Sequence, residues 1–383
     1  MRQLEERYLE RLSQLYPTIA KASTEIINLQ AILNLPKGTE HFLTDIHGEY
    51  EAFAHVLKNG SGSVRRKIDD VFGNTLSSRD KQTLATLIYY PKEKMDRIKK
   101  TEKNMEDWYK ITLYRLIEVC KRTASKYTRS KVRKALPADF AYVIEELITE
   151  KKDMTDKESY YNAIVSTIIR IGRAEKFIIA MSELIQRLTV DHLHIVGDVF
   201  DRGGSADKIL DLLYDYHSLD IEWGNHDIPW MGAACGNDAC ICNVIRNNLK
   251  YNNVEILENA YGISLRQLML FGMKTYGIED GIEAARAAIT VMLFKLEGQL
   301  ILAHPEYEMG NRLMLDRLDD LQDVGVDRKR FPTVDDERPY ALNDEEAVIM
   351  RKLHRQFVTG QRLQKHVRFL YDKGSMYNVY NGN

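Results

Sequence analysis

The sequence has no long apolar run and little net charge. Nowhere in its 383 residues does an apolar run approach the ~18 residues that a membrane-spanning helix needs. The formal net charge of −2 argues against non-specific binding to nucleic acid, because the negatively charged phosphate backbone binds basic protein surfaces. The charged residues 1–7 are followed by no apolar core and do not resemble a signal peptide. We therefore expect a protein that uses neither a membrane nor nucleic acid.

Cysteine is also scarce, with four residues in the whole chain. So few thiols in a long chain favour a reducing compartment, and we predict a cytoplasmic protein. Three of the four lie close together, at Cys235, Cys240 and Cys242. Their spacing fits no common structural zinc site, so we expect ordinary buried or loop thiols here and at Cys120.

The remaining composition is that of a globular protein, with 44% hydrophobic and 29% charged residues. The length allows two or three domains, and we find no repeat or low-complexity segment. We predict an α/β (α+β) fold with four segments. These are residues 1–76 with N-terminal helices and a first strand, 77–188 as a helical insertion, 189–310 as the core, and 311–383 as a helical segment that leads into a further core strand.

Polar side chains gather at the predicted ends of three short strands. Apolar runs bounded by turn residues predict buried strands at residues 41–44, 192–196 and 220–223. Ligand sites in open α/β sheets lie just past the carboxyl ends of strands. One such turn can arise by chance, but three in succession are a strong signal. The turns carry Asp45 and His47; Asp198, Asp201 and Arg202; and Asn225 and His226.

These residue types suit a cation and a phosphate. Asp45 and His47 stand two positions apart at a strand end, where side chains of that spacing share one side and can chelate an ion. Asp198 and Asp201 add two carboxylates, and the Arg202 guanidinium is a planar fork for phosphate oxygens. Mixed oxygen and nitrogen ligands suit Mn²⁺, Fe or Zn²⁺ better than Mg²⁺.

Hydrophobic periodicity and breaker residues predict the other elements that bear on the site. The segment between Asp45 and Asp198 spans 198 − 45 = 153 residues and is mostly helical, far longer than the ~30 residues of a plain βαβ unit. Residues 299–304 look like another strand, ending in His304. Further helices are predicted at 1–35, 49–59, 206–217, 311–321 and 344–370, and a last strand begins at 376–380.

The run from Lys121 to Lys134 holds seven basic residues and no acidic one. It can be a patch that binds an anionic substrate or effector. It can equally be a solvated helix face, which is the commoner meaning of such a run.

The three turns together resemble the motifs of the calcineurin-like metallophosphoesterases. The matching runs are Asp45-x-His47, Gly197-Asp198-x-x-Asp201-Arg202-Gly203 and Gly224-Asn225-His226-Asp227. The resemblance implies a β-sandwich flanked by helices, with two metal ions at its strand ends. It implies that Asp45, His47 and Asp198 hold the first ion, and that Asp198 and Asn225 begin the ligand set of the second. It also implies that His226 is the general acid, that Asp201 orients it, and that Arg202 binds the phosphate.

Sequence runs that flank these motifs identify a more specific family. They resemble class III fructose-1,6-bisphosphatase, from about residue 8 to the last residue. That family implies removal of the 1-phosphate of fructose 1,6-bisphosphate with Mn²⁺ as cofactor, giving fructose 6-phosphate for gluconeogenesis. It also leaves room for nucleotide or phosphometabolite effectors and for a homo-oligomer. The runs are residues 24–29, 31–42, 127–131, 187–194, 331–333 and 366–370.

The resemblance also implies that the sequence stops early. Class III enzymes continue past the Tyr-Asn-Gly-Asn that ends this chain, and two later His residues complete their second metal site. Asn381-Gly382 is a hairpin signal with no returning strand. We therefore expect a truncated chain with an incomplete second metal site, and His304 is a weak substitute ligand.

Two other functions stay open at this point. One is a metallophosphoesterase that acts on a phosphoprotein or a dinucleotide, against which the helical insertion argues because an exposed site serves a protein substrate better. The other is an inactive fragment that binds a metal ion or a sugar phosphate without turnover.

Overall fold

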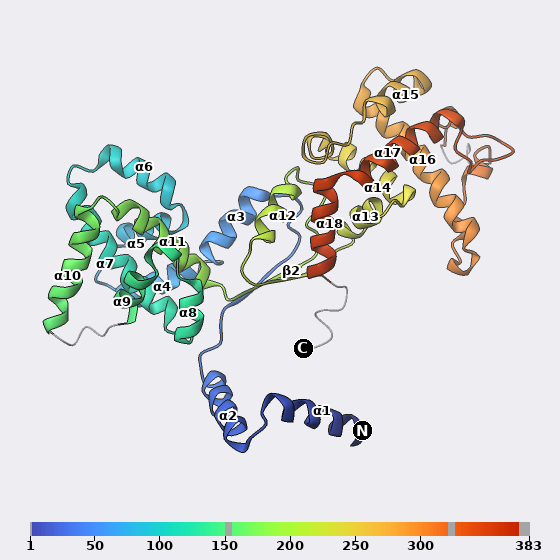
Figure 1. Ribbon diagram of the computed structural model, residues 1–383. Coiled ribbons are helices and arrows are strands. Elements are labelled where there is room, and N and C mark those ends of the chain that lie inside the picture. Colours follow the sequence, from blue (N-terminus) through green and yellow to red (C-terminus); the bar gives the residue numbers. More distant parts are fainter. Residues whose placement is uncertain (1, 150–154, 321–325, 375–383) are drawn as a thin grey trace. The chain divides into compact units, whose positions relative to one another are not determined.

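The computed structural model describes residues 2–149, 155–320 and 326–374. They form two compact units. One unit comprises Met1–His41 and His55–His192, and the other comprises Phe42–Ala54 and Leu193–Asn383. Helices joined to a small sheet confirm the predicted mixed α/β class (Figure 1). No helix within these ranges is both long and apolar enough to cross a membrane.

The first unit is helical and has its own hydrophobic core. Helix α7 buries Leu113, Leu116, Ile117 and Cys120, whose spacing places them on one stripe that packs against α11. The side chain of Asn104 caps the start of α7 by accepting the Asp107 N–H. The helices of this unit are α1 (Arg2–Leu15), α2 (Ile19–Leu33), α4 (Ser63–Phe72), α5 (Ser78–Tyr89), α6 (Pro91–Thr101), α7 (Met105–Ala124), α8 (Arg129–Ala135), η1 (Ala138–Phe140), α9 (Ala141–Thr149), α10 (Thr155–Arg170) and α11 (Ala174–Thr189).

The sheet has three strands in the order β1-β2-β3, namely β1 (Glu40–Leu43), β2 (His192–Val196) and β3 (Leu219–Glu222). β2 and β3 are parallel, with Leu193 opposite Leu219 and Val196 opposite Glu222. All three strands lie within a residue or so of their predicted positions. Within β3, Ile221 also forms an isolated parallel bridge to Gly374. The predicted strand at 376–380 lies outside the described residues.

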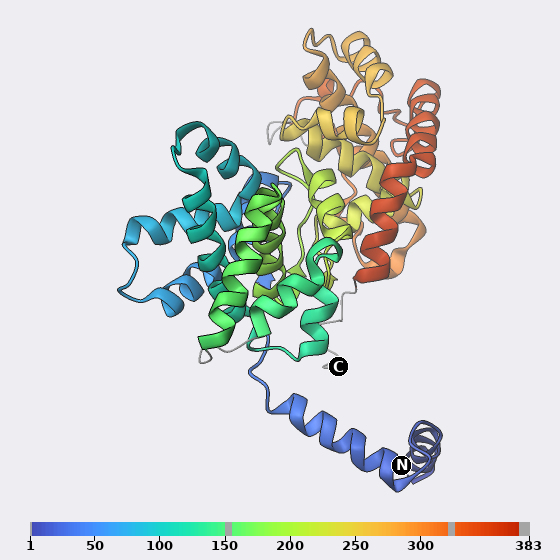
Figure 2. The same ribbon diagram turned by 60° about the vertical axis from the view of Figure 1, so that its left-hand side comes forward.

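Most of the second unit beyond the strands is helical. Helix α16 packs against both α14 and α15, in the yellow-to-orange part of the chain (Figures 1 and 2). The elements that follow the strands are α3 (Tyr50–Asn59), α12 (Ala206–Tyr214), α13 (Asp227–Ala234), α14 (Asp238–Lys250), η2 (Ile256–Ala260), α15 (Arg266–Tyr276), α16 (Gly281–Ala303), η3 (Pro305–Tyr307), η4 (Gly310–Arg312), η5 (Leu315–Arg317), η7 (Arg328–Arg330), α17 (Asp344–Thr359) and α18 (Gln361–Lys373).

Three predicted elements are wrong. Residues 299–304 are the last turn of α16 and its cap, because a short apolar run does not by itself distinguish a strand from a helix end. The described part of the predicted helix at 311–321, residues 311–320, contains isolated 3₁₀ turns in place of a helix. The helix predicted at 344–370 is two helices, α17 and α18, which meet at Gly360.

The N-terminus of α16 offers a modest test of these helix assignments. The Asp280 side chain accepts the backbone N–H groups of Ile282 and Glu283. An Asp280→Ala substitution should lower the free energy of unfolding by about 1 kcal/mol, because two helix donors lose their acceptor. Urea denaturation would measure this, with exposed Glu279→Ala as the matched control; equal stability of the two variants would contradict the cap.

Candidate metal centre

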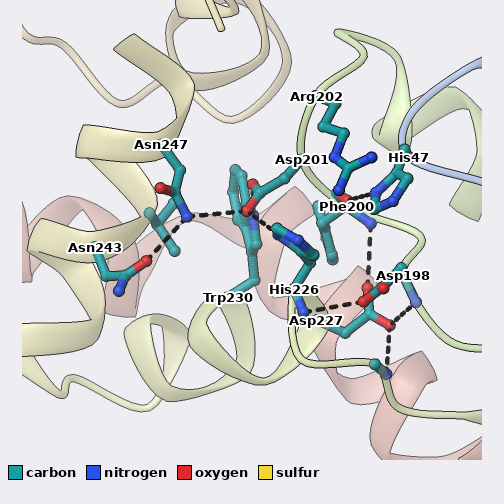
Figure 3. A network of polar contacts seen from close by, with 12 residues as sticks. His47, Asp198, Phe200, Asp201, Arg202, His226, Asp227, Trp230, Asn243 and Asn247 are labelled. Atoms are coloured by element: carbon teal, nitrogen blue, oxygen red, sulfur yellow. Dashed lines mark hydrogen bonds and ion pairs between the residues drawn. The ribbon is translucent and has the colours of Figure 1, made fainter. Parts of the chain in front are cut away.

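The turns after β1 and β2 are joined by backbone hydrogen bonds. The His47 N–H donates to the Asp198 carbonyl at 2.8 Å, and the Gly48 N–H donates to the Val199 carbonyl at 2.9 Å. The Gly203 N–H donates back to the His47 carbonyl at 2.7 Å. These bonds hold the turn after β1 against the turn after β2, so the side chains of both turns meet in one place (Figure 3).

Unusual backbone geometry concentrates in the same turns. Eight non-glycine residues in the described ranges have positive φ, and five of them belong to these turns: Asp45, His47, Asp198, Asp201 and Arg202. Such conformations cost free energy and persist where the surroundings determine them, commonly at functional sites. Close approach adds a second constraint, because a Cβ on Gly224 would overlap the Asp198 carboxylate.

Asp45, His47 and Asp198 bring together ligand atoms that lie within 4.8 Å of one another. The His47 Nδ1 lies 3.2 Å from the Phe200 carbonyl, which fixes the proton on Nδ1. His47 Nε2 is buried without a hydrogen-bond partner among the described residues and lies 3.5 Å from Asp45 Oδ1. A buried imidazole lone pair beside two carboxylates fits a divalent cation. Asn225 has an exposed side chain one position before His226.

His226 is positioned from two directions. Its backbone N–H donates to Asp198 Oδ1 at 3.0 Å, which ties it to the metal-competent carboxylate. Its Nδ1 lies 2.9 Å from Asp201 Oδ2, so the carboxylate holds the proton on Nδ1 and leaves Nε2 for proton transfer. The His226 and His47 rings meet edge to face with centroids 5.2 Å apart. The Asp201–His226 pair thus has the geometry of an oriented acid–base group beside the candidate metal ligands.

Asp201 is itself fixed by residues that the sequence did not single out. Its side chain is 2% exposed. The Trp230 indole N–H donates to Oδ1 at 3.1 Å, and the Asn247 amide donates to Oδ2 at 3.2 Å (Figure 3). Asn247 is also oriented, since its amide donates to Asn243 Oδ1 at 3.0 Å. Asn243 and Asn247 stand one helical turn apart on α14, with no local motif to reveal them.

Asp227 is the most important residue to which the sequence analysis assigned no role. Its buried carboxylate accepts four backbone N–H groups, from Asp198, Val199, Phe200 and Gly224, at 2.9 to 3.1 Å. Burial raises the pKa of Asp227 to about 6, against the backbone N–H bonds that lower it. The sequence signal was present, because an acid opening a helix just after Gly-Asn-His has several backbone donors within reach. Asp227 therefore joins the turns after β2 and β3.

Arg202 lies in the turn after β2, and its side chain is exposed. Its carbonyl accepts the Asn253 side-chain amide at 2.5 Å, which anchors the backbone at that point. Its guanidinium forms no ion pair with any carboxylate of the described residues. It is therefore able to bind an anion that enters the site.

Other predicted candidates lie elsewhere. His304 follows α16, where its Nδ1 lies 2.8 Å from Glu306 and its ring stacks on Tyr307. The structure does not bring it into the group formed by Asp45, His47 and Asp198. The four cysteines are free thiols, and burial raises the pKa of Cys120 to about 12.

The basic run at the end of α7 and in α8 is largely engaged within the first unit. Lys126 donates to Thr39 Oγ1 at 2.9 Å and to the Thr189 carbonyl at 3.1 Å, and its burial lowers its pKa to about 8. Arg122 pairs with Asp70 at 3.2 Å, and Lys131 pairs with Asp191. These contacts favour a structural role for most of the run.

The close packing at Gly224 gives a direct test of the centre. A Gly224→Ala substitution should weaken Mn²⁺ binding by about 10–100-fold, because the added Cβ would push the Asp198 carboxylate away. Calorimetric titration with Mn²⁺ would measure it. Gly310→Ala is the matched control, since its Cβ would meet no atom within 4 Å. Equal Mn²⁺ affinity of the two variants would show that Asp198 does not hold the ion.

Comparisons with known proteins show which family the chain resembles. The family model described as Firmicute fructose-1,6-bisphosphatase matches residues 7–383. The chain is 54% identical to fructose-1,6-bisphosphatase class 3 1 of Clostridium beijerinckii, over 98% of this chain and 61% of that protein. It is also 54% identical to fructose-1,6-bisphosphatase class 3 of Clostridium botulinum, over 98% of this chain and 60% of that protein. The chain thus spans about three fifths of the length of these relatives. No solved structure matches it.

Proposed function

This chain belongs to the Firmicute fructose-1,6-bisphosphatase family, and from that premise we propose that the protein removes the 1-phosphate of fructose 1,6-bisphosphate and releases fructose 6-phosphate. The observation that carries the proposal is the convergence of three strand-end turns. They carry the candidate metal ligands, an oriented imidazole, and a guanidinium that forms no ion pair with the carboxylates of the described residues. A metal-dependent phosphomonoesterase can use these three parts as metal ligands, general acid and phosphate-binding group.

We propose the metal-site architecture of the calcineurin-like metallophosphoesterases, with Mn²⁺ as the resident ion. Asp45, His47 and Asp198 would hold one ion, and Asp198 and Asn225 would contribute to a second. A mixture of carboxylate, imidazole and amide ligands favours Mn²⁺ over Mg²⁺. Bound divalent ions would lower the pKa of a water molecule and neutralise the charge that develops on the phosphoryl oxygens.

The protein's own side chains would carry the remaining steps. Arg202 would grip the phosphate through its planar guanidinium and orient it for in-line attack. His226, protonated on both ring nitrogens, would donate its Nε2 proton to the leaving sugar oxygen. Asp201 would stabilise the charged imidazole through the Nδ1 bond and hold its orientation, and Trp230 and Asn247 would keep Asp201 in place.

A panel of phosphorylated compounds tests the substrate preference. Each compound is assayed with Mn²⁺ and with the protein expressed from its own gene. The panel holds fructose 1,6-bisphosphate, a phosphopeptide and a dinucleotide. We expect the highest kcat/KM for fructose 1,6-bisphosphate. A higher value for the phosphopeptide or the dinucleotide would contradict the proposed substrate while leaving the metal centre intact.

A further inference from the structure

Five basic side chains of the second unit line one cavity of about 640 Å³. They come from three elements that are well separated in the sequence, so the cluster is a product of the fold. We name it the α14–α16 cavity. Its basic residues are Arg246 and Lys250 on α14, Arg286 on α16, and Lys329 and Arg330 on η7.

The charge of this cavity is poorly compensated. Glu283 is the one acidic residue of its lining, so five positive charges and one negative charge leave a formal charge of 5 − 1 = +4. Glu283 is engaged in an ion pair with Arg286. Within the parts of the chain that the structure describes, the other four cations form no ion pair with a carboxylate. A concentration of like charge in a concave site costs free energy unless an anion offsets it.

Aromatic residues line the cavity between these charges. Tyr276, Phe294 and Phe331 line the cavity together with Val291. Tyr276 and Phe331 pack against a buried cluster that contains Val291, Val334 and Tyr340. The cavity is therefore held open by packing. Its size is within the range of small-molecule sites, and it combines apolar walls with converging charged groups as such sites do.

The α14–α16 cavity is separate from the candidate metal centre. None of its lining residues belongs to the turns that carry Asp45, Asp198 or His226. Helix α14 contributes to both places through adjacent faces. Asn247 reaches Asp201, whereas Arg246 and Lys250, one turn apart, line the cavity.

We propose that the α14–α16 cavity binds a small phosphorylated metabolite. Its phosphate oxygens would contact Arg246 and Arg330, since guanidinium groups match phosphate geometry. Its carbon frame would rest on the Phe294 and Phe331 rings. A nucleic-acid strand fits less well, because the charge is confined to a concave site and the whole chain has a net charge of −2.

Calorimetric titration with pyrophosphate and with a nucleoside monophosphate tests the proposal, at about 0.15 M salt to screen loose surface binding. EDTA keeps metal ions out, so the result does not depend on the proposed phosphatase activity. The unphosphorylated nucleoside is the ligand control. Arg246→Gln and Arg330→Gln are the test variants. Arg330 is exposed, so its replacement should leave the fold intact even if Arg246→Gln is destabilised.

We expect saturable binding of both phosphorylated ligands and none of the nucleoside. Each test variant should weaken binding by about tenfold, the usual loss of one charged hydrogen-bond partner. Arg355→Gln, on an exposed face of α17, and Arg202→Gln, at the metal centre, should change it by less than about twofold. The proposal would be overturned by no saturable binding at millimolar concentration, by equal binding of the nucleoside, or by loss of binding in Arg202→Gln alone.

Discussion

A His226→Ala variant should release phosphate from fructose 1,6-bisphosphate with a kcat about 10²–10⁴-fold below that of the wild-type protein. The expected loss follows from the position of the imidazole, which is tied to Asp198 through its backbone and to Asp201 through Nδ1. Since the general acid acts in the transition state, KM should change little while kcat falls. Steady-state kinetics with saturating Mn²⁺ would measure both.

The matched control is His354→Ala. His354 also pairs through Nδ1 with a carboxylate, that of Asp238 at 2.8 Å, but it lies on α17 outside the three strand-end turns. Its replacement should leave kcat within about twofold of the wild-type value. If His226→Ala kept more than about a tenth of the wild-type kcat, the leaving oxygen would receive its proton from another group.

An Asp227→Ala variant should lower the free energy of unfolding by about 3 kcal/mol or more. The substitution removes the acceptor of four backbone N–H groups at the junction of two strand-end turns. Each buried donor left without a partner costs about 1–3 kcal/mol, and water entering the space would recover part of the loss. Urea denaturation followed by circular dichroism would measure the change.

The same variant should also bind Mn²⁺ more weakly, because the Asp198 backbone would lose one of its anchors. Asp215→Ala is the control, since Asp215 is exposed and ends α12. It should shift the free energy of unfolding by no more than about 0.5 kcal/mol. If Asp227→Ala were as stable as this control, the turns would be held by their own backbone bonds alone.

Local signals in the sequence account for the three strands and their polar turns, whereas contacts that depend on helix packing had no such signal. The three strands were found because each pairs a short apolar run with a turn of unusual composition, and both signals are local. The group of Asp45, His47 and Asp198 followed because strands in an open sheet bring their ends together. A contact such as Asn247 to Asp201, 46 residues apart, depends on how α14 packs and has no local signal.

The error at residues 299–304 has a particular physical cause. Gly298 resembles a break before a strand, yet it lies inside α16, where a Cβ would overlap the Tyr340 ring. The glycine serves tertiary packing, and the short apolar run after it simply continues the helix. His304 then follows the helix end and pairs with Glu306. Gly298 is small because the Tyr340 ring, distant in the sequence, packs against it. Sequence alone does not distinguish such a glycine from one in a turn.

The most direct test of the central claim compares wild-type protein with an Asp198→Asn variant. An amide at this position keeps an acceptor for the His226 N–H but removes the charge that would hold the ions. Phosphate and fructose 6-phosphate are measured as Mn²⁺ is titrated into a metal-free sample containing fructose 1,6-bisphosphate. We predict Mn²⁺-dependent release of both products by the wild-type protein and none above background by Asp198→Asn. Equal release by the two proteins, or release by metal-free protein, would contradict a metal-dependent phosphatase centred on Asp198.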